Sequence, residues 1–506
     1  MAKCIGGGAP MVGLVGFGFI DKQSHCAYFG SIVRNGDSMK PQFDDSILGR
    51  EKIWKLLVKL SVPATIGMMV NAVYNFVDAI YIARGVGTNA IGGLAIAFPV
   101  QMLVMAFGGL LGMGAASVIS RNLGSGNRER AATAVGNTLV LSSILGVVIA
   151  VVGLIFLDPL IYLLGASDIL HGFAKDYLSI ILIGGIFMTV AMVASVLVRS
   201  EGQAKVAMRI MIIGAGLNIV LDPIFIFVFK LGIAGAAWAT TISQFVSFLY
   251  AIIFYLRKRS AISLRRKSFM PQWSVLKEIL ALGFPAFIRQ GGISIFMVLV
   301  NNTLGHYGGD IYISAYGIIN RIIMFVLMPI FGMVQGFQPI AGYNYGAKKP
   351  DRVKLTVKLS MAYLVVFGSS AALLLSIFPG FFVSLFSPDK NLIEVARGFL
   401  RIIVLMFPLI GIQFVGASFF QAIGKPIPSL ILGMSRQYLL LIPLVIILPM
   451  IFGIDGVIAS FPTADLLATV ITVTWLIREM KKLHLIGHTE EGSEPAGVKA
   501  VMQSAD

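Results

Sequence analysis

Two carboxylates lie inside long apolar stretches of this chain. Asp78 follows an uncharged run from Leu60 to Val77, and Asp222 lies within the sequence LNIVLDPIFIF. A charged side chain at the centre of a bilayer costs at least about 2.5–3.5 kcal/mol, so such residues commonly mark ion or proton pathways. Burial also favours the neutral form of a carboxyl group, which lets it load and release a proton. A static acid bonded to a neighbouring helix is the alternative for either residue alone.

Uncharged polar residues accompany both acids at helical spacing. Asn71 and Asn75 precede Asp78 by seven and three residues, and Asn218 precedes Asp222 by four. Residues three or four positions apart share a helix face, so each acid is predicted to continue a polar stripe. Interhelical hydrogen bonding, at about 0.6 kcal/mol per contact, is the alternative for such amides. Interhelical hydrogen bonding alone explains the presence of two carboxylates in one half of the chain less well.

The stretch that follows Asp222 adds further oxygen atoms. Thr240, Thr241 and Gln244 lie in the next apolar segment, and Pro223 leaves the Ile219 carbonyl without its helical donor. Carboxylate, amide, hydroxyl and carbonyl oxygens are the ligands that hard cations such as Na⁺ prefer, and they also serve a proton. We therefore expect one oxygen-rich pocket that binds H⁺ or Na⁺, with no other metal.

The segment that carries Asp78 also contains a proline. Pro63 lies early in this segment, below the polar stripe. A proline inside a helix removes a hydrogen bond and commonly causes a kink. We expect the helix to bend at Pro63 and to couple protonation of Asp78 to a change of shape.

The elements that position these residues are predicted to be membrane-spanning helices. The chain has 506 residues, of which 57% are hydrophobic and only 13% are charged, whereas a soluble chain carries about 25% charged residues. A span needs about 20 apolar residues. Twelve segments satisfy this, which predicts an all-α integral membrane protein; their approximate bounds are 57–83, 92–120, 132–157, 174–198, 207–229, 233–256, 278–304, 312–340, 353–378, 396–420, 428–451 and 456–477.

The net charge of +16 does not indicate nucleic-acid binding, because the charges fall between the apolar runs. Lysine and arginine are concentrated after the even-numbered spans, as in the linker RKRSAISLRRK. Cytoplasmic loops of membrane proteins carry this excess of positive charge. We therefore expect a multi-pass protein of the cell inner membrane with both termini in the cytoplasm.

Four pairs of short segments recur at a constant offset of 221 or 222 residues. LSVP ending at Pro63 matches LGFP ending at Pro285, and RNLGSG from Arg121 matches YNYGAK from Tyr343. SEGQAK from Ser200 matches AIGKPI, and GIAGAAWA from Gly232 matches GIDGVIAS. A tandem repeat of six spans is predicted to give two bundles of like orientation, related by a pseudo-two-fold axis along the membrane normal, with a substrate cavity between them. Such duplication is typical of secondary transporters.

The duplication divides the chain into five parts. At the 222-residue offset, Asp78 and Asp222 correspond to Val300 and Leu444, so the pair of acids belongs to the first half only. The expected parts are a poorly ordered N-terminal extension 1–46 with Met39 as an alternative start, a first lobe 47–256, a basic linker 257–277, a second lobe 278–482 and a cytoplasmic tail 483–506.

Taken together, these motifs resemble those of the multidrug and toxic compound extrusion (MATE) transporters. The resemblance rests on LSVPATIGMMVNAVYNFVDAIYIARGVG, SRNLGSGN, LNIVLDPIFIF with GIAGAAWATTISQ, and MVQGFQPIAGYNYGAKK, and it covers residues 47–482. It implies a monomeric exporter of amphipathic, often cationic compounds that works by H⁺ or Na⁺ antiport with alternating access. It further implies a coupling site in the first lobe and a helix that bends at Pro63. The coupling residues implied by the resemblance are Asp78, Asn218, Asp222 and Thr240. Asn71, Asn75 and Gln244 are the supporting polar residues expected from their positions in the spans.

Two other functions remain open. A lipid-linked saccharide flippase of the same superfamily would favour arginine or lysine in the cavity for an anionic diphosphate, whereas the first lobe presents acids. A membrane-embedded enzyme would need a nucleophile–base pair or a metal cluster inside the bilayer. The five histidines lie outside the expected spans: His25, His171, His306, His484 and His488. We therefore expect no enzyme activity and no cofactor.

Overall fold

Residues 47–257 and 260–491, which the computed structural model describes, are almost entirely helical and include no strand. Within these ranges, 11 helices are long and apolar enough to cross a membrane, and one bent helix pair raises the number of spans to as many as 12. The predicted all-α fold with twelve spans is confirmed. The expected N-terminal extension and the last residues of the expected tail, from 492 on, lie outside the described residues.

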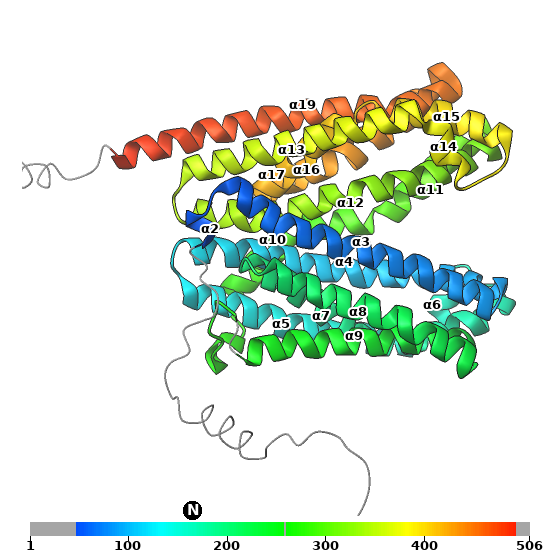
Figure 1. Ribbon diagram of the computed structural model, residues 1–506, viewed down its shortest axis with the longest axis horizontal. Helices are drawn as coiled ribbons and strands as arrows, with labels where there is room; N and C mark the ends of the chain where they lie inside the picture. Colours follow the sequence, from blue (N-terminus) through cyan, green and yellow to red (C-terminus); the bar gives the residue numbers. More distant parts are fainter. Residues whose placement is uncertain (1–46, 258–259, 492–506) are drawn as a thin grey trace, which may run out of the picture. The chain divides into compact units, whose positions relative to one another are not determined.

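The first half of the chain forms a bundle around α7, which packs against α4, α5, α8 and α9 (Figure 1). Its helix α3 packs on one side against α8 and on the other against α12 of the second half. The elements of this half are α2 (Ile47–Arg50), α3 (Ile53–Gly85), α4 (Thr88–Gly124), α5 (Arg128–Ile155), α6 (Leu157–Leu163), α7 (Asp168–Ser200), α8 (Ala204–Pro223), the π-helical η1 (Ile224–Val228) and α9 (Gly232–Leu256).

The second half repeats this arrangement after a short linker that contains η2 (Arg266–Phe269). Helix α16 packs against α13, α12 and α19, while α10 reaches across to α4 of the first half. The elements are α10 (Trp273–Gly291), α11 (Ile293–Gly308), α12 (Asp310–Gly346), α13 (Pro350–Ile377), α14 (Pro379–Ser384), α15 (Lys390–Val404), α16 (Phe407–Ala422), α17 (Pro426–Met434), the π-helical η3 (Ser435–Leu441), α18 (Ile442–Ile447) and α19 (Pro449–Glu491).

The tenth span is not the single straight helix expected over 396–420. It consists of α15 and α16, which meet at an angle of 50° after Val404. Pro408 lies in the first turn of α16, where its missing N–H and fixed backbone are tolerated, whereas inside a continuous helix they would remove a hydrogen bond. The bend therefore follows from the position of this proline.

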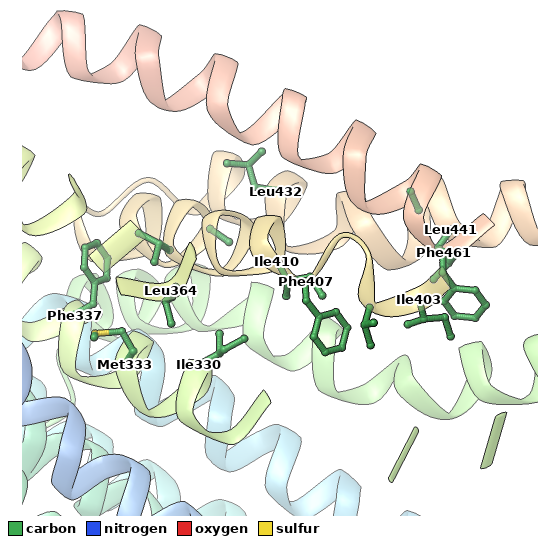
Figure 2. Packing of buried hydrophobic residues seen from close by; sticks show 14 of the residues in the cluster. Ile330, Met333, Phe337, Leu364, Ile403, Phe407, Ile410, Leu432, Leu441 and Phe461 are labelled. Carbon is green, nitrogen blue, oxygen red and sulfur yellow. The ribbon is translucent and has the colours of Figure 1, made fainter. Parts of the chain in front are cut away.

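The second half has a large core of interdigitating apolar side chains. Phe337 of α12, Phe407 of α16 and Phe461 of α19 are almost completely buried, and Figure 2 shows them among aliphatic neighbours such as Leu364 and Leu432. Lipid tails are as apolar as these side chains, so helix association in a membrane depends on close van der Waals packing rather than on a hydrophobic driving force. This core fixes how α12, α16 and α19 lie against one another.

The two halves meet backbone to backbone where α4 and α12 end. A Cβ atom at Gly124 would lie 1.9 Å from the Tyr343 carbonyl oxygen, and one at Gly346 would lie 2.0 Å from the Arg121 carbonyl oxygen. Arg121 and Tyr343, like Gly124 and Gly346, are related by the 222-residue offset. The pseudo-two-fold axis therefore passes between these helix ends. We call this the closed end of the molecule.

Candidate functional site

The two intramembrane carboxylates are brought together by α3 and α8. Asp78 is 6% exposed and Asp222 is completely buried. Each carboxyl group lies within electrostatic range of the other. A second negative charge close to a buried carboxylate is unfavourable unless a cation or a proton compensates it. The pair therefore has the electrostatic character of a cation- or proton-binding site.

Asn218 joins this pair to α9. Its Nδ2 donates to Asp222 Oδ1 at 3.1 Å and to Thr240 Oγ1 at 3.1 Å. One amide thus orients a carboxylate on its own helix and a hydroxyl on the next. Asp222 is followed by Pro223 and the π-helical segment η1, so the backbone departs from regular α-helix immediately after the acid. Such π segments are frequent at functional sites.

Three oxygen atoms of this cluster are buried without a hydrogen-bond partner among the described residues. They are Asp78 Oδ1, Asp222 Oδ2 and Asn218 Oδ1. A buried polar atom without a partner costs free energy, and native proteins contain few of them. These unpartnered oxygens come from α3 and α8, and the Thr240 hydroxyl of α9 lies beside them. Oxygens of these types match the ligand preference of H⁺ or a hard cation such as Na⁺. Asp78, Asn218, Asp222 and Thr240 are therefore present in one cluster.

The expected supporting residues lie at the margin of the cluster or outside it. Asn75 is exposed, and its Nδ2 donates to the Asn71 carbonyl oxygen at 2.8 Å rather than to Asp78. Asn71 is half-buried. Gln244 is half-buried one turn beyond Thr240, and no hydrogen bond connects it to the described residues of the cluster. The polar stripe on α3 therefore turns away from Asp78 at Asn75.

Three residues near the two acids were not predicted from the sequence patterns. Tyr177 is buried and Tyr74 is half-buried; both lie within electrostatic range of Asp78, and Gln101 Nε2 donates to the Tyr177 hydroxyl at 3.1 Å. Tyr74 precedes Asp78 by four residues, so helical spacing was a sufficient signal to find it. Tyr177 and Gln101 come from α7 and α4, and only the folded structure brings them to this place.

Pro63 lies inside α3, about four turns before Asp78 on the side of the closed end. The helix continues through it, and the missing proline N–H leaves the Lys59 carbonyl without its helical donor. Ser61 Oγ, two residues earlier, donates to the Met333 carbonyl oxygen of α12 at 3.4 Å. The proline therefore lies where α3 touches the second half.

The second half contains charged residues of its own. Arg436 of η3 and Asp465 of α19 form an ion pair, and Asp465 is 1% exposed. Arg436 lies within the span Pro426–Ile447 and Asp465 within the span Pro449–Leu483. Arg289, near the end of α10, was overlooked; it is half-buried, and its guanidinium makes no hydrogen bond or ion pair with the described residues.

No metal centre of the kind that an enzyme would need is visible in the described part of the chain. Within residues 47–257 and 260–491, no group of three or more His, Cys, Asp or Glu side chains is placed to hold a metal ion.

Comparisons with known proteins agree on one family. The sequence profile of the MatE family matches residues 63–224 and 285–447, one segment in each half. The chain is 30% identical over 413 residues to the multidrug export protein MepA of Staphylococcus haemolyticus, covering 82% of this chain and 91% of the relative. It is 28% identical over 435 residues to MepA of Staphylococcus aureus, covering 85% and 95%.

A solved structure has the same fold. It is described as the outward-facing conformation of a multidrug resistance MATE family transporter of the MOP superfamily. It superposes with a TM-score of 0.82 at 28% identity, over 89% of this chain and 100% of that one.

Proposed function

The chain belongs to the MatE family of membrane transporters, and from this premise we propose that it exports amphipathic, often cationic, small molecules in exchange for inward-moving H⁺ or Na⁺. It is a multi-pass membrane protein and a transporter rather than an enzyme. The observation that carries the exchange mechanism is the cluster of Asp78, Asn218, Asp222 and Thr240, in which three oxygens lack a partner among the described residues.

Coupling follows from the electrostatics of this cluster. When no cation is bound, ionised Asp78 and Asp222 repel each other and favour separation of α3 from α8. A proton or Na⁺ removes this repulsion and draws the two helices together. Because α3 also packs against α12, a displacement of α3 reaches the contact between the two halves. Bending at Pro63, between the acids and the closed end, supplies the required hinge.

Alternating access is then a rocking of the two bundles about the pseudo-two-fold axis. The bundles touch at the ends of α4 and α12, so this conformation is sealed at that end. By the distribution of lysine and arginine, we assign the closed end and both termini to the cytoplasm. The structure then corresponds to a carrier sealed toward the cytoplasm, and we expect it to work as a monomer.

The test is efflux of a cationic dye from proteoliposomes in which a pH gradient and a Na⁺ gradient are imposed separately. We expect at least one gradient to drive efflux by the wild type, and Asp78→Asn or Asp222→Asn to abolish the coupled component. Full gradient-driven efflux by both variants would exclude the cluster as the coupling site. Efflux that responds to neither gradient would exclude antiport.

Arg289 favours a second candidate function, the flipping of a lipid-linked saccharide. A half-buried guanidinium without a described partner in α10 suits an anionic diphosphate better than a cation. The two functions are separated by comparing Arg289→Gln with wild type on both substrates. A flippase loses translocation of a fluorescent diphosphate lipid in this variant, whereas a cation exporter keeps its dye efflux.

A further inference from the structure

Arg199, in the last turn of α7, is a buried cation without a partner among the described residues. The residue is only 4% exposed. Its guanidinium makes no hydrogen bond or ion pair with the part of the chain that the structure describes, and its Nη1 atom is buried. A guanidinium stays protonated at any physiological pH. The protein therefore buries a positive charge that no described side chain compensates.

This burial is unfavourable in the conformation seen here. Buried charges in proteins are normally paired or hydrogen-bonded, because removing a charge from water without compensation costs much free energy. The cost is present only while the group stays both buried and unpaired. Arg199 therefore disfavours this conformation relative to one in which water or a hydrogen-bond acceptor reaches its guanidinium.

The duplication relates Arg199 to Gln421 of α16, 222 positions later. Gln421 is also buried, at 3% exposed, but its Nε2 donates to the Leu282 carbonyl oxygen of α10 at 2.7 Å. Leu282 lies three residues before Pro285, the proline that corresponds to Pro63. In the second half, the donor at this position is therefore bonded to the main chain of the proline-containing helix.

The two proline-containing helices, α3 and α10, pack in the same register on the opposite half. A Cβ atom at Gly336 of α12 would lie 2.7 Å from the Ser61 nitrogen of α3, and one at Gly114 of α4 would lie 2.9 Å from the Gly283 nitrogen of α10. The 222-residue offset relates these two contacts. Helix α7 touches α12, just as α16 touches α4. The pseudo-symmetry therefore places Arg199 at the junction of the halves, on the side of α3.

The first half has acceptors that correspond to the one used by the second half. Leu60 corresponds to Leu282, and the preceding carbonyl, that of Lys59, is the one that Pro63 leaves without its helical donor. Neighbouring helices can satisfy backbone groups that a proline frees. No hydrogen bond joins Arg199 to either carbonyl in this conformation.

We propose that Arg199 is a positioning residue, which disfavours the conformation sealed at the closed end and donates to the main chain of α3 at Lys59 or Leu60 when this helix bends at Pro63. The inference rests on the alternation between two conformations in the proposed function. The guanidinium is buried without a partner in the sealed conformation and gains an acceptor in the bent one. An interaction present in only one of two states shifts the equilibrium toward that state.

The test follows conformation and stability of the full-length protein in detergent, without substrate or an ion gradient. Cysteines replace the exposed Lys205 of α8 and Asp351 of α13 in a Cys4→Ser, Cys26→Ser background, and attached spin labels report the distance between the halves. Arg199→Gln and Arg199→Met should each lower the separated population about tenfold, because they remove the cost of a buried group without a partner. Both should also raise the melting temperature, since the folded protein no longer buries an unpaired charge.

Three further variants separate the charge from its contact with α3. Arg199→Lys keeps the charge and should retain the separated population of the wild type. Arg209→Gln is the matched control, because it removes an exposed charge from α8 in the same half and should change neither measurement. Pro63→Ala restores the helical donor to the Lys59 carbonyl, so its effect on the label distance and that of Arg199→Met should not add.

Three results would overturn the proposal. The first is an unchanged or larger separated population, together with an unchanged or lower melting temperature, in both Arg199→Gln and Arg199→Met. The second is a change of the same size in Arg209→Gln, which would reduce the effect to net charge. The third is full additivity of Pro63→Ala and Arg199→Met, which would exclude the contact with α3.

These results are distinct from a failure of the coupling site. If Asp78→Asn and Asp222→Asn kept full gradient-driven efflux, the assignment of the coupling cation would be wrong. The label distances and melting temperatures of the Arg199 variants need neither efflux nor a bound cation, so they would still decide the role of the guanidinium.

Discussion

Replacing Asn218 by alanine tests whether its side-chain amide only stabilises the fold or also orients the ligands of the coupling cation. The side chain makes two hydrogen bonds of 3.1 Å, to Asp222 Oδ1 and Thr240 Oγ1. Interhelical hydrogen bonds in membranes contribute about 0.6 kcal/mol each, so Asn218→Ala should lower the free energy of unfolding by only about 1 kcal/mol. The same change misplaces two proposed cation ligands. At 1.36 kcal/mol per factor of ten, losing the orientation of even one should raise the half-saturating concentration of the coupling cation about tenfold.

Asn137 supplies the matched control in the same half. Its Nδ2 donates to the carbonyl oxygens of Ser268 and Met270 at 3.0 and 2.9 Å, and its Oδ1 accepts from the Gln272 N–H at 2.7 Å. It fastens the linker to α5, far along the sequence from the acids. Asn137→Ala should therefore lower stability at least as much as Asn218→Ala.

The assay is thermal unfolding in detergent combined with efflux measured against the concentration of H⁺ or Na⁺. We expect Asn137→Ala to change stability alone and Asn218→Ala to shift the cation dependence. If both variants shift the cation dependence equally, or neither does, the assignment of Asn218 to the coupling site is wrong.

Two further predictions concern the closed end. Glu278→Gln breaks the two ion pairs that Glu278 makes across the halves. At about 0.7 kcal/mol per partly exposed pair, it should increase the separated population about tenfold, measured by the distance between spin labels attached to the two halves. Glu129→Gln, which removes an exposed pair, should leave that population unchanged. Gly124→Ala should abolish transport without loss of membrane insertion, because its Cβ would meet backbone at 1.9 Å, whereas Gly109→Ala in the same helix has open space and should transport normally.

The composition and the internal offset were sufficient to predict the helical spans and the duplication. A long apolar run has few alternatives to a helix in a bilayer, because every backbone polar group must be bonded internally. The offset of 222 residues also relates the contacts at Gly124 and Gly346, which lie on the same axis. Local spacing correctly placed Asn218 beside Asp222, since residues four apart on a helix are neighbours.

Helical spacing did not predict the direction of a side chain where that direction depends on contacts with neighbouring residues. Asn75 shares the predicted face with Asp78, yet it bonds the Asn71 carbonyl and is exposed. Tyr177 reaches the acids from another helix, and no periodicity in the sequence indicates that approach. The bend at Val404 was missed for a different reason: hydropathy is continuous across it, and the interruption comes from backbone chemistry around Pro408.

The central claim is that Asp78 and Asp222 bind the cation, H⁺ or Na⁺, that is exchanged for the exported compound. It is tested most directly by measuring proton release, or ²²Na⁺ displacement, when a cationic substrate is added to the purified wild type, Asp78→Asn and Asp222→Asn. We predict that substrate displaces the cation from the wild type and from neither variant, while both variants still bind the substrate. Undiminished displacement in both variants would contradict the account.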